Sequence, residues 1–242
     1  MNVYFDIETI PLQDIDLKAD LFNEHCAKLP ELLAEVKAPG NYKDAAKIAE
    51  YVSAERAKIE AGHDAAFDDW WLKTSLDGAY GQICCIGFAI DDGPTQAIAQ
   101  DKHTKSSEKE SLEIFFSQLT NLYSPTDHFR FIGHNSNAFD IPFIWKRCII
   151  LGVKPPIWFP RDPKPWSETT FDTMIAWNSA QPRQGGSMER ICKVLGIPGK
   201  GDMDGSKVWP AVRDGRIDEV ASYCMDDVRR TREMHRRMEF LG

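Results

Sequence analysis

The sequence has no uninterrupted apolar stretch of about 20 residues, the length that a membrane-spanning helix needs. Its N-terminus lacks the basic start and apolar middle of a secretion signal. The six cysteines form no C-x-x-C pair and mostly lie in apolar runs, which argues against a zinc or disulfide framework and indicates reduced thiols. Internal repeats and low-complexity tracts are also missing. We therefore expect a cytoplasmic protein with no membrane contact.

An excess of positive charge is missing as well. The 37 acidic residues outnumber the 29 basic ones and give a net charge of −8. The imbalance lies in residues 1–80, where 8 basic and 16 acidic side chains give 8 − 16 = −8. The remainder carries 21 acidic (37 − 16) and 21 basic (29 − 8) side chains, enough Arg and Lys to hold phosphates locally. Overall charge therefore does not exclude a nucleic-acid partner.

What the sequence does have begins at its first nine residues, MNVYFDIET, which are typical of a buried strand. Alternation along a strand places Asp6 and Glu8 on the same face. Two like charges on a mostly buried strand are costly unless a cation neutralises them, and a divalent metal with oxygen ligands would do so. An exposed strand end with two solvated acids explains this stretch equally well.

Residues 12–78 are expected to form a mainly helical insertion after the first strand. Apolar residues recur at helical spacing from Leu21 to Val36, and a second helix is predicted over residues 42–61. Trp70 and Trp71 follow in a short polar segment, where core or interface packing is expected rather than base stacking. The insertion carries no catalytic spacing and is interpreted as a peripheral packing or oligomerisation element.

The next residues predict further strands and a helix. Residues 83–90 read as a strand, residues 95–100 as its hairpin partner, and residues 106–122 as an amphipathic helix with a capping box between Ser107 and Glu110. A strand is also expected at residues 129–133. Strands combined with a crossing helix predict a mixed sheet with helices packed against it, in one domain of 242 residues.

A loop and a helix follow the strand at residues 129–133. Asp140 is expected at the helix N-cap and Gly152 at its C-terminal end. Asp140 could serve only as a cap. However, it follows Asn135 and Phe139 in a loop at the carboxyl end of a strand, where α/β proteins commonly place their sites. His134 is interpreted as a structural hydrogen-bonding residue.

A long C-terminal helix is predicted from the apolar stripe between Ile217 and Met234. Tyr223 and Asp227 are four residues apart and stack on one flank of this helix, whereas Asp226 is rotated away. The arginines that follow suit the helix dipole, so capping and solubility explain much of this run. Phosphate contact by one or two of them stays open.

FDIET, then N-x-x-x-F-D, then Y-x-x-x-D, in this order, resemble the motifs of DEDD-superfamily (DnaQ-like) 3′–5′ exonucleases of the DEDDy branch. The sequence is most similar to predicted exonucleases related to the proofreading domain of B-family DNA polymerases. Each motif alone is weak, but all three on strand, loop and helix are strong together. The resemblance implies an α/β, ribonuclease H-like exonuclease fold: a central mixed β-sheet flanked by helices.

The resemblance also implies a role for each matching residue. Asp6 would bridge two divalent ions, Mg²⁺ or Mn²⁺, while Glu8 and Asp227 would hold the ion that binds the attacking water. Asp140 would steady the second ion, and Tyr223 would orient the nucleophile. The residues expected to seat the terminal nucleotide are Asn135, Phe139 and the backbone at Thr9, with Lys200 as a weaker phosphate contact. Asp172 is interpreted as a cap or structural acid rather than a metal ligand.

The expected activity is hydrolysis from the 3′ end of nucleic acid to release nucleoside 5′-monophosphates. Two metal ions suit this reaction because they stabilise both the attacking and the leaving oxygens. Single-stranded DNA is the expected substrate, with RNA as an alternative, because the ligand set does not read the sugar 2′ position. A catalytically silent nucleic-acid-end binding module and a small-nucleotide phosphohydrolase are the other hypotheses. Pathways from repair or RNA trimming to antiviral defence stay open, as does a homo-oligomer formed through the insertion.

Overall fold

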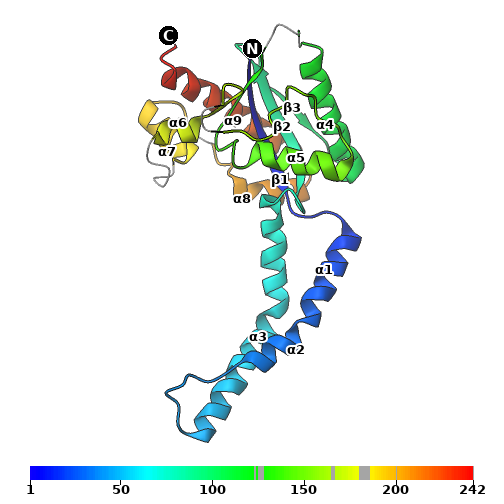
Figure 1. The fold of residues 1–242 in the computed structure, drawn as a ribbon, viewed down its shortest axis with the longest axis vertical. Helices are drawn as coiled ribbons and strands as arrows, with labels where there is room; N and C mark the ends of the chain where they lie inside the picture. Colours follow the sequence, from blue (N-terminus) through cyan, green and yellow to red (C-terminus); the bar gives the residue numbers. More distant parts are fainter. Residues whose placement is uncertain (123, 125–127, 165–166, 180–185, 200, 242) are drawn as a thin grey trace.

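The computed structural model describes residues 1–122, 124, 128–164, 167–179, 186–199 and 201–241. Within them a five-stranded mixed sheet has the strand order β3-β2-β1-β4-β5 (Figure 1). The central strand β1 pairs antiparallel with β2 and parallel with β4. The strands are β1 Asn2–Ile10, β2 Gln82–Ile90, β3 Gln96–Ala99, β4 Arg130–Gly133 and β5 Thr170–Asp172. The mixed sheet predicted from the sequence is confirmed, including the β2–β3 hairpin, whereas the edge strand β5 was not predicted.

Helices cover both faces of the sheet (Figure 1). Val3, Phe5 and Ile7 of β1 pack in one core with α4 and α5, whereas Tyr4 packs on the opposite face with Val228 of α9. The strand's period of two thus sorts its side chains between two layers, and Asp6 and Glu8 fall on the α9 side with Tyr4. The helices of this body are α4 Lys105–Thr120, α5 Asp140–Leu151, α6 Thr173–Asn178, α7 Met188–Leu195, α8 Gly205–Arg213 and α9 Ile217–Met238.

Two helix starts differ from the expectation. The capping box of α4 joins Thr104 to Ser107, because α4 begins at Lys105 and Thr104 has the extended backbone of an N-cap. Thr104 Oγ1 accepts from Ser107 N at 3.1 Å, and Ser107 Oγ accepts from Thr104 N at 3.0 Å. Asp140 is the first residue of α5 and not its N-cap, which is Phe139. Gly152 ends α5 in the left-handed conformation, as predicted (φ 65°).

The helices between β1 and β2 form an arm, residues 12–76, that projects away from the sheet (Figure 1). It consists of α1 Ile15–Ala27, α2 Leu29–Glu35, α3 Ala45–Lys73 and a 3₁₀ turn at Thr74–Leu76. The first predicted helix is therefore two, with Pro30 in the first turn of α2. The second does not end near Ala61 but continues to Lys73, where Phe67 packs on Phe22 of α1 and Trp71 packs on Trp209 of the body.

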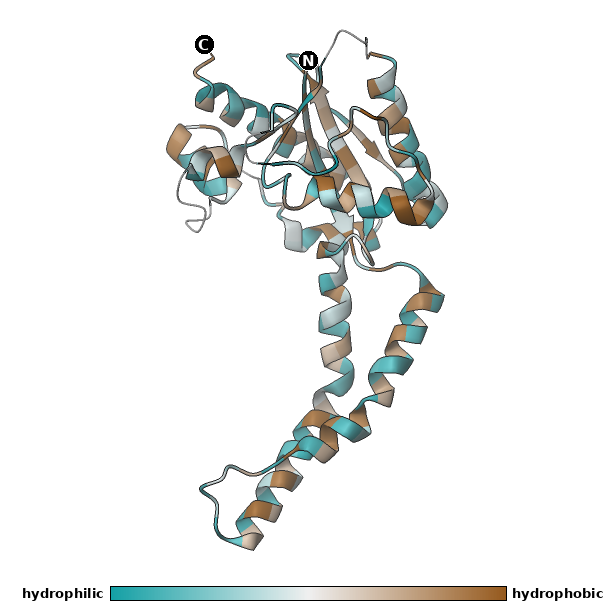
Figure 2. Cartoon of the chain, in the orientation of Figure 1, coloured by the Kyte–Doolittle hydropathy of each residue, from teal (hydrophilic) through white to brown (hydrophobic). Residues whose placement is uncertain are grey.

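The arm buries few of its side chains. Helices α1 and α2 have no buried residue, and α3 has only His63 and Phe67. His63 stacks on His25 of α1 with ring centroids 3.8 Å apart. Figure 2 shows hydrophobic and hydrophilic segments alternating along the arm, whereas the strands of the sheet are mostly hydrophobic. Across the described residues, none of the helices combines the length and the apolar character that crossing a membrane requires.

The foot of the arm is fixed to the body. Trp71 Nε1 donates to the carbonyl of Leu12 at 2.9 Å, and the Trp71 ring meets the Trp209 ring of α8 edge to face at 5.7 Å. Thr74 Oγ1 accepts from Leu12 N at 2.9 Å. Trp71 therefore has the packing role expected of it, and the arm leaves the body from a hydrogen-bonded base.

Candidate active site

The strand carboxylates lie together with a cysteine of α9. Asp6, Glu8 and Cys224 each offer a ligand atom, and these atoms lie within 4.8 Å of one another. Cys224 Sγ donates to Asp6 Oδ2 at 3.5 Å. The close approach of α9 depends on Gly87 of β2, because a Cβ there would lie 2.7 Å from Cys224 Sγ. Asp6 and Glu8 thus point the same way, as the alternation of β1 predicts.

Asp140 joins this group from the other side of β1. Its side chain is buried, and Oδ1 accepts from the backbone N–H of Ile7, between the two strand carboxylates, at 3.0 Å. Burial raises the pKa of Asp140 to about 7. The hydrogen bond from Ile7 acts in the opposite direction, and the charges of Asp172 and Asp227 add to the rise.

Tyr223 and Asp227 come from successive turns of α9 and are both buried. Removal from solvent raises the pKa of Tyr223, and the negative charges of Glu8, Asp227 and Asp6 raise it further. The phenol therefore stays neutral at neutral pH and can donate a hydrogen bond. Arg230, also buried, donates from Nη1 to Asp227 Oδ1.

The electrostatics of Asp6 indicate which kind of group the site suits. Burial raises the pKa of Asp6 well above its usual range, followed by the charges of Glu8, Asp140 and Asp227, while the Cys224 hydrogen bond lowers it. Such mutual repulsion among buried carboxylates disappears when a cation binds between them. Carboxylate oxygens are the ligands that Mg²⁺ and Mn²⁺ prefer. The donor set therefore fits a divalent cation.

The four predicted carboxylates are not equally close to one another. Asp140 and Asp227 act on Asp6 through their charges, but neither is in the set of ligand atoms within 4.8 Å. Each makes a different contact: Asp140 accepts from Ile7 N, and Asp227 accepts from Arg230. Asp6 and Glu8 of β1 therefore already lie close together, whereas Asp140 and Asp227 lie to either side of them.

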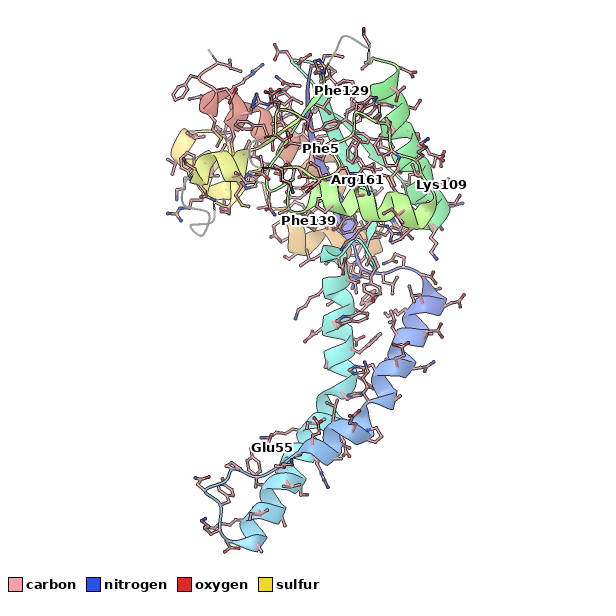
Figure 3. The ribbon with its side chains drawn as sticks, in the orientation of Figure 1. Phe5, Glu55, Lys109, Phe129, Phe139 and Arg161 are labelled. Atoms are coloured by element: carbon pink, nitrogen blue, oxygen red, sulfur yellow. The ribbon has the colours of Figure 1, made fainter. Side chains whose placement is uncertain are left out.

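The predicted nucleotide-seating residues lie on β1 and on the segment from β4 to α5. Thr9 Oγ1 donates to the Ser75 carbonyl at 2.6 Å, which leaves backbone contact as its predicted role. Asn135 has a left-handed backbone (φ 61°). Phe139 lies at the start of α5, with its ring 5.5 Å from that of Phe143 (Figure 3). Lys200 lies outside the described residues.

Asp172 positions the loop that carries Asn135. Its Oδ1 accepts from Asn135 N at 3.0 Å and from Met174 N at 2.9 Å, and its Oδ2 accepts from Asn137 N at 3.0 Å. The interpretation of Asp172 as a cap and structural acid is confirmed. His134 Nδ1 lies 2.9 Å from Thr173 Oγ1, in agreement with a structural role.

Sequence reasoning missed two residues. Cys224 belongs to the apolar stripe between Ile217 and Met234, but its thiol also contacts Asp6. Arg230 belongs to the arginines that follow Asp227, which suit the helix dipole, but its guanidinium is buried beside Asp227. The spacing of three residues between Asp227 and Arg230 was a visible signal for this ion pair.

Comparison with known proteins places the chain. Residues 74–242 match a family model described as a predicted 3′–5′ exonuclease related to the exonuclease domain of PolB. The family B DNA polymerase from the hyperthermophilic archaeon Pyrobaculum calidifontis has a similar structure, with a TM-score of 0.53 and 15% identity over 99% of this chain. The chain spans only 24% of that polymerase. None of the curated proteins matches it.

The sheet order and the flanking helices define an α/β protein with a ribonuclease H-like fold. The family model covers well over half of the chain, and the protein belongs to the family of predicted 3′–5′ exonucleases related to the exonuclease domain of PolB. The predicted resemblance to exonucleases related to the proofreading domain of B-family DNA polymerases is therefore confirmed. Asp140, Tyr223 and Asp227 lie within the matched residues, whereas Asp6 and Glu8 precede them.

Proposed function

We propose that this protein is a metal-dependent 3′–5′ exonuclease that releases nucleoside 5′-monophosphates from the 3′ end of nucleic acid. The observation that carries the proposal is the arrangement around β1: Asp6 and Glu8 lie beside Cys224, Asp140 bonds to the strand between them, and Tyr223 and Asp227 approach from α9. Single-stranded DNA is the proposed substrate and RNA the alternative.

The proposed cofactors are two divalent ions, Mg²⁺ or Mn²⁺, held by Asp6, Glu8, Asp140 and Asp227. When bound, such ions would activate water and stabilise charge on the attacking and leaving oxygens. The protein's own contribution is to hold four carboxylates close enough that their repulsion is relieved by cations. Burial raises the pKa values of Asp6 and Asp140, and the charges of neighbouring carboxylates raise them further.

Tyr223 orients the attacking water in this proposal. A phenol whose pKa lies above 10 cannot serve as a base near neutral pH, so positioning is the role left to it. Asn135, Phe139 and the Thr9 backbone seat the terminal nucleotide, with the exposed face of the Phe139 ring stacking on the base. Asp172 maintains the Asn135 loop through its backbone hydrogen bonds.

Digestion of labelled oligonucleotides tests the proposal. Matched single- and double-stranded DNA and RNA, labelled at the 5′ end, are incubated with Mg²⁺ or Mn²⁺. Stepwise shortening from the 3′ end with release of 5′-monophosphates is the expected result. Binding without shortening would identify a silent end-binding module, and turnover of mononucleotides but not oligomers would identify a small-nucleotide phosphohydrolase.

We also propose that the arm joins two copies of the chain. Helices α1 and α2 bury none of their residues, and Leu17, Leu32 and Leu72 of the arm are more than a third exposed. Packing against a second arm would cover these side chains in a helical bundle. Residues 12–78 carry 14 acidic and 8 basic side chains (8 − 14 = −6), so the two arms would repel each other at low salt.

A further inference from the structure

Asp227, one of the four proposed metal ligands, forms a buried ion pair with Arg230. Arg230 Nη1 donates to Asp227 Oδ1, and both side chains are only 7% exposed. The other arginine pairs of α9 differ in this respect. Arg229 bonds Asp226 with the same spacing of three residues, but these two side chains are 52% and 48% exposed.

The position of Asp227 agrees with its engagement by Arg230. Asp6 and Glu8 lie in the set of ligand atoms within 4.8 Å of one another, and Asp227 is not in that set. Arg230 contacts Oδ1 of Asp227, and a divalent cation bound to the same carboxylate would lie close to the guanidinium, so the two positive charges would repel each other at low solvent exposure. The pairing therefore places two cations in competition for one buried carboxylate.

The surroundings of Arg230 allow its guanidinium to leave Asp227 without becoming buried and unpaired. A cavity of about 380 Å³ lies between the loop Gly196–Gly199 and α9, and Arg230 lines it together with Arg229 and Glu233. This volume is sufficient for water to reach a displaced guanidinium. Glu233, one turn further along α9, lines the same cavity; Arg237 Nε donates to its Oε1 at 3.0 Å, and its second oxygen offers Arg230 an alternative acceptor.

We propose that Arg230 is a positioning residue that competes with a divalent cation for Asp227 and so lowers the metal affinity of the active site. This inference rests on the proposed function, because it takes Asp227 as a metal ligand. Arg230 holds Asp227 neutralised in the metal-free protein, and metal uptake requires this ion pair to open. Arginine stays charged at every relevant pH, so the ion pair does not open through deprotonation of Arg230.

The test is Mn²⁺ binding measured by isothermal titration calorimetry on the full chain without nucleic acid. Arg230→Gln keeps a polar side chain but removes the charge, and we expect it to bind Mn²⁺ roughly tenfold more tightly than the wild type. The Mn²⁺ concentration that gives half-maximal exonuclease rate should fall by a similar factor. Arg230→Lys keeps a positive charge but lacks the planar guanidinium, and we expect its Mn²⁺ affinity to lie between those of the wild type and Arg230→Gln.

Arg229→Gln is the matched control, because it removes an exposed pair of the same spacing on the same helix. Its Mn²⁺ affinity should equal that of the wild type. Thermal unfolding without metal and with saturating Mn²⁺ checks that the variants fold. Without metal, Arg230→Gln should melt below the wild type. Mn²⁺ should raise the Tm of Arg230→Gln by more than it raises the Tm of the wild type.

Unchanged or weaker Mn²⁺ binding in folded Arg230→Gln would overturn the inference. If Arg230→Gln does not fold, Arg230→Lys decides alone, with unchanged or weaker binding as the contradicting result. The proposed function is tested independently of this inference. A wild-type protein that binds Mn²⁺ but shortens no nucleic acid would refute the exonuclease. Calorimetry on the variants would still measure the competition at Asp227.

Discussion

At the scale of single residues, the site combines carboxylates whose negative charges destabilise the protein in the absence of metal. Asp140 shows this most clearly, because its folded-state pKa is about 7 instead of 3.8. A raised carboxyl pKa contributes stability that is fully present below the unfolded value and is lost as pH rises through 7. The metal-free protein should therefore lose stability through Asp140 between pH 4 and pH 7.

Replacing Asp140 by Asn should separate stability from activity. Asn keeps the acceptor for Ile7 N but carries no charge, so we expect the metal-free variant to melt a few degrees above the wild type at pH 8. The same variant should lose exonuclease activity by at least about a hundredfold, together with most of the Mn²⁺-induced rise in Tm. Calorimetric melting curves with and without Mn²⁺ provide the measurement.

Asp226→Asn is the control for this experiment, because Asp226 is a half-exposed carboxylate that pairs with the exposed Arg229. It should leave both Tm and activity near the wild-type values. A metal-free Asp140→Asn protein that melts below the wild type at pH 8 would contradict the electrostatic interpretation of the site.

Tyr223→Phe tests positioning against base catalysis. The raised pKa of Tyr223 keeps the phenol protonated, so its loss should lower kcat by roughly tenfold at every pH from 6 to 9 without changing the shape of the profile. Single-turnover rates measured across this range check the prediction. A variant whose rate deficit disappears at low pH would instead show that Tyr223 loses a proton during the reaction.

At the scale of elements, one buried ion pair fixes the helix that carries Asp140. Arg147 of α5 donates from Nε to Glu108 Oε1 at 2.8 Å and from Nη2 to Oε2 at 2.7 Å. Glu108 Oε1 also accepts from Ile83 N of β2 at 2.9 Å. This pair therefore joins α4, α5 and the sheet at a single point beneath the site.

Removing one partner of this pair should be strongly destabilising. Arg147→Met leaves the Glu108 carboxylate buried without its cation, and we expect a loss of about 3–5 kcal/mol in the free energy of unfolding. The double variant Glu108→Leu with Arg147→Met should recover most of this loss, since no buried charge is left. Urea unfolding followed by circular dichroism measures both.

Lys146 provides the comparison from the neighbouring position of α5. Its bond to Asp77 joins two half-exposed side chains, so Lys146→Met should cost less than about 1 kcal/mol. Equal losses in Lys146→Met and Arg147→Met would show that burial does not determine the strength of these contacts.

At the scale of the whole molecule, the arm and the body differ in how much of their surface is buried. The body buries both faces of its sheet, whereas the arm extends one helix of 29 residues, roughly 43 Å at 1.5 Å per residue, from a small base. Glu55 lies far along this arm, distant from Phe139 and the site (Figure 3). Substitutions on the arm should therefore change the association of two chains and leave the exonuclease rate unchanged.

Analytical ultracentrifugation tests the proposed association of two arms. The wild type should sediment as a dimer of the 27.5 kDa chain, and association should strengthen as salt screens the acidic arms. The double variant Leu17→Gln with Leu32→Gln should dissociate to the monomer while keeping its exonuclease rate. Lys58→Gln, also exposed on the arm, is the control and should stay dimeric. A monomeric wild type at high salt would contradict the proposal.

The sequence alone determined the body of this protein to a large extent. Strand alternation placed Asp6 and Glu8 on one face, and helical spacing placed Tyr223 and Asp227 on one flank, because both periods are fixed by the backbone. Gly152 marked the end of α5 through its left-handed conformation. The three motifs were sufficient to indicate the family, because their order follows the order of the elements.

The tertiary structure alone decided which contacts these residues make. The full length of α3 depended on packing of Phe67 and Trp71 against α1 and the body, which a local pattern interrupted by polar residues does not reveal. The pairing of Arg230 with Asp227, rather than with solvent, depended on burial by neighbouring elements. Periodicity fixes the direction of a side chain, but only the packed chain fixes its partner, because charge and hydrogen-bond energies depend on what excludes water around them.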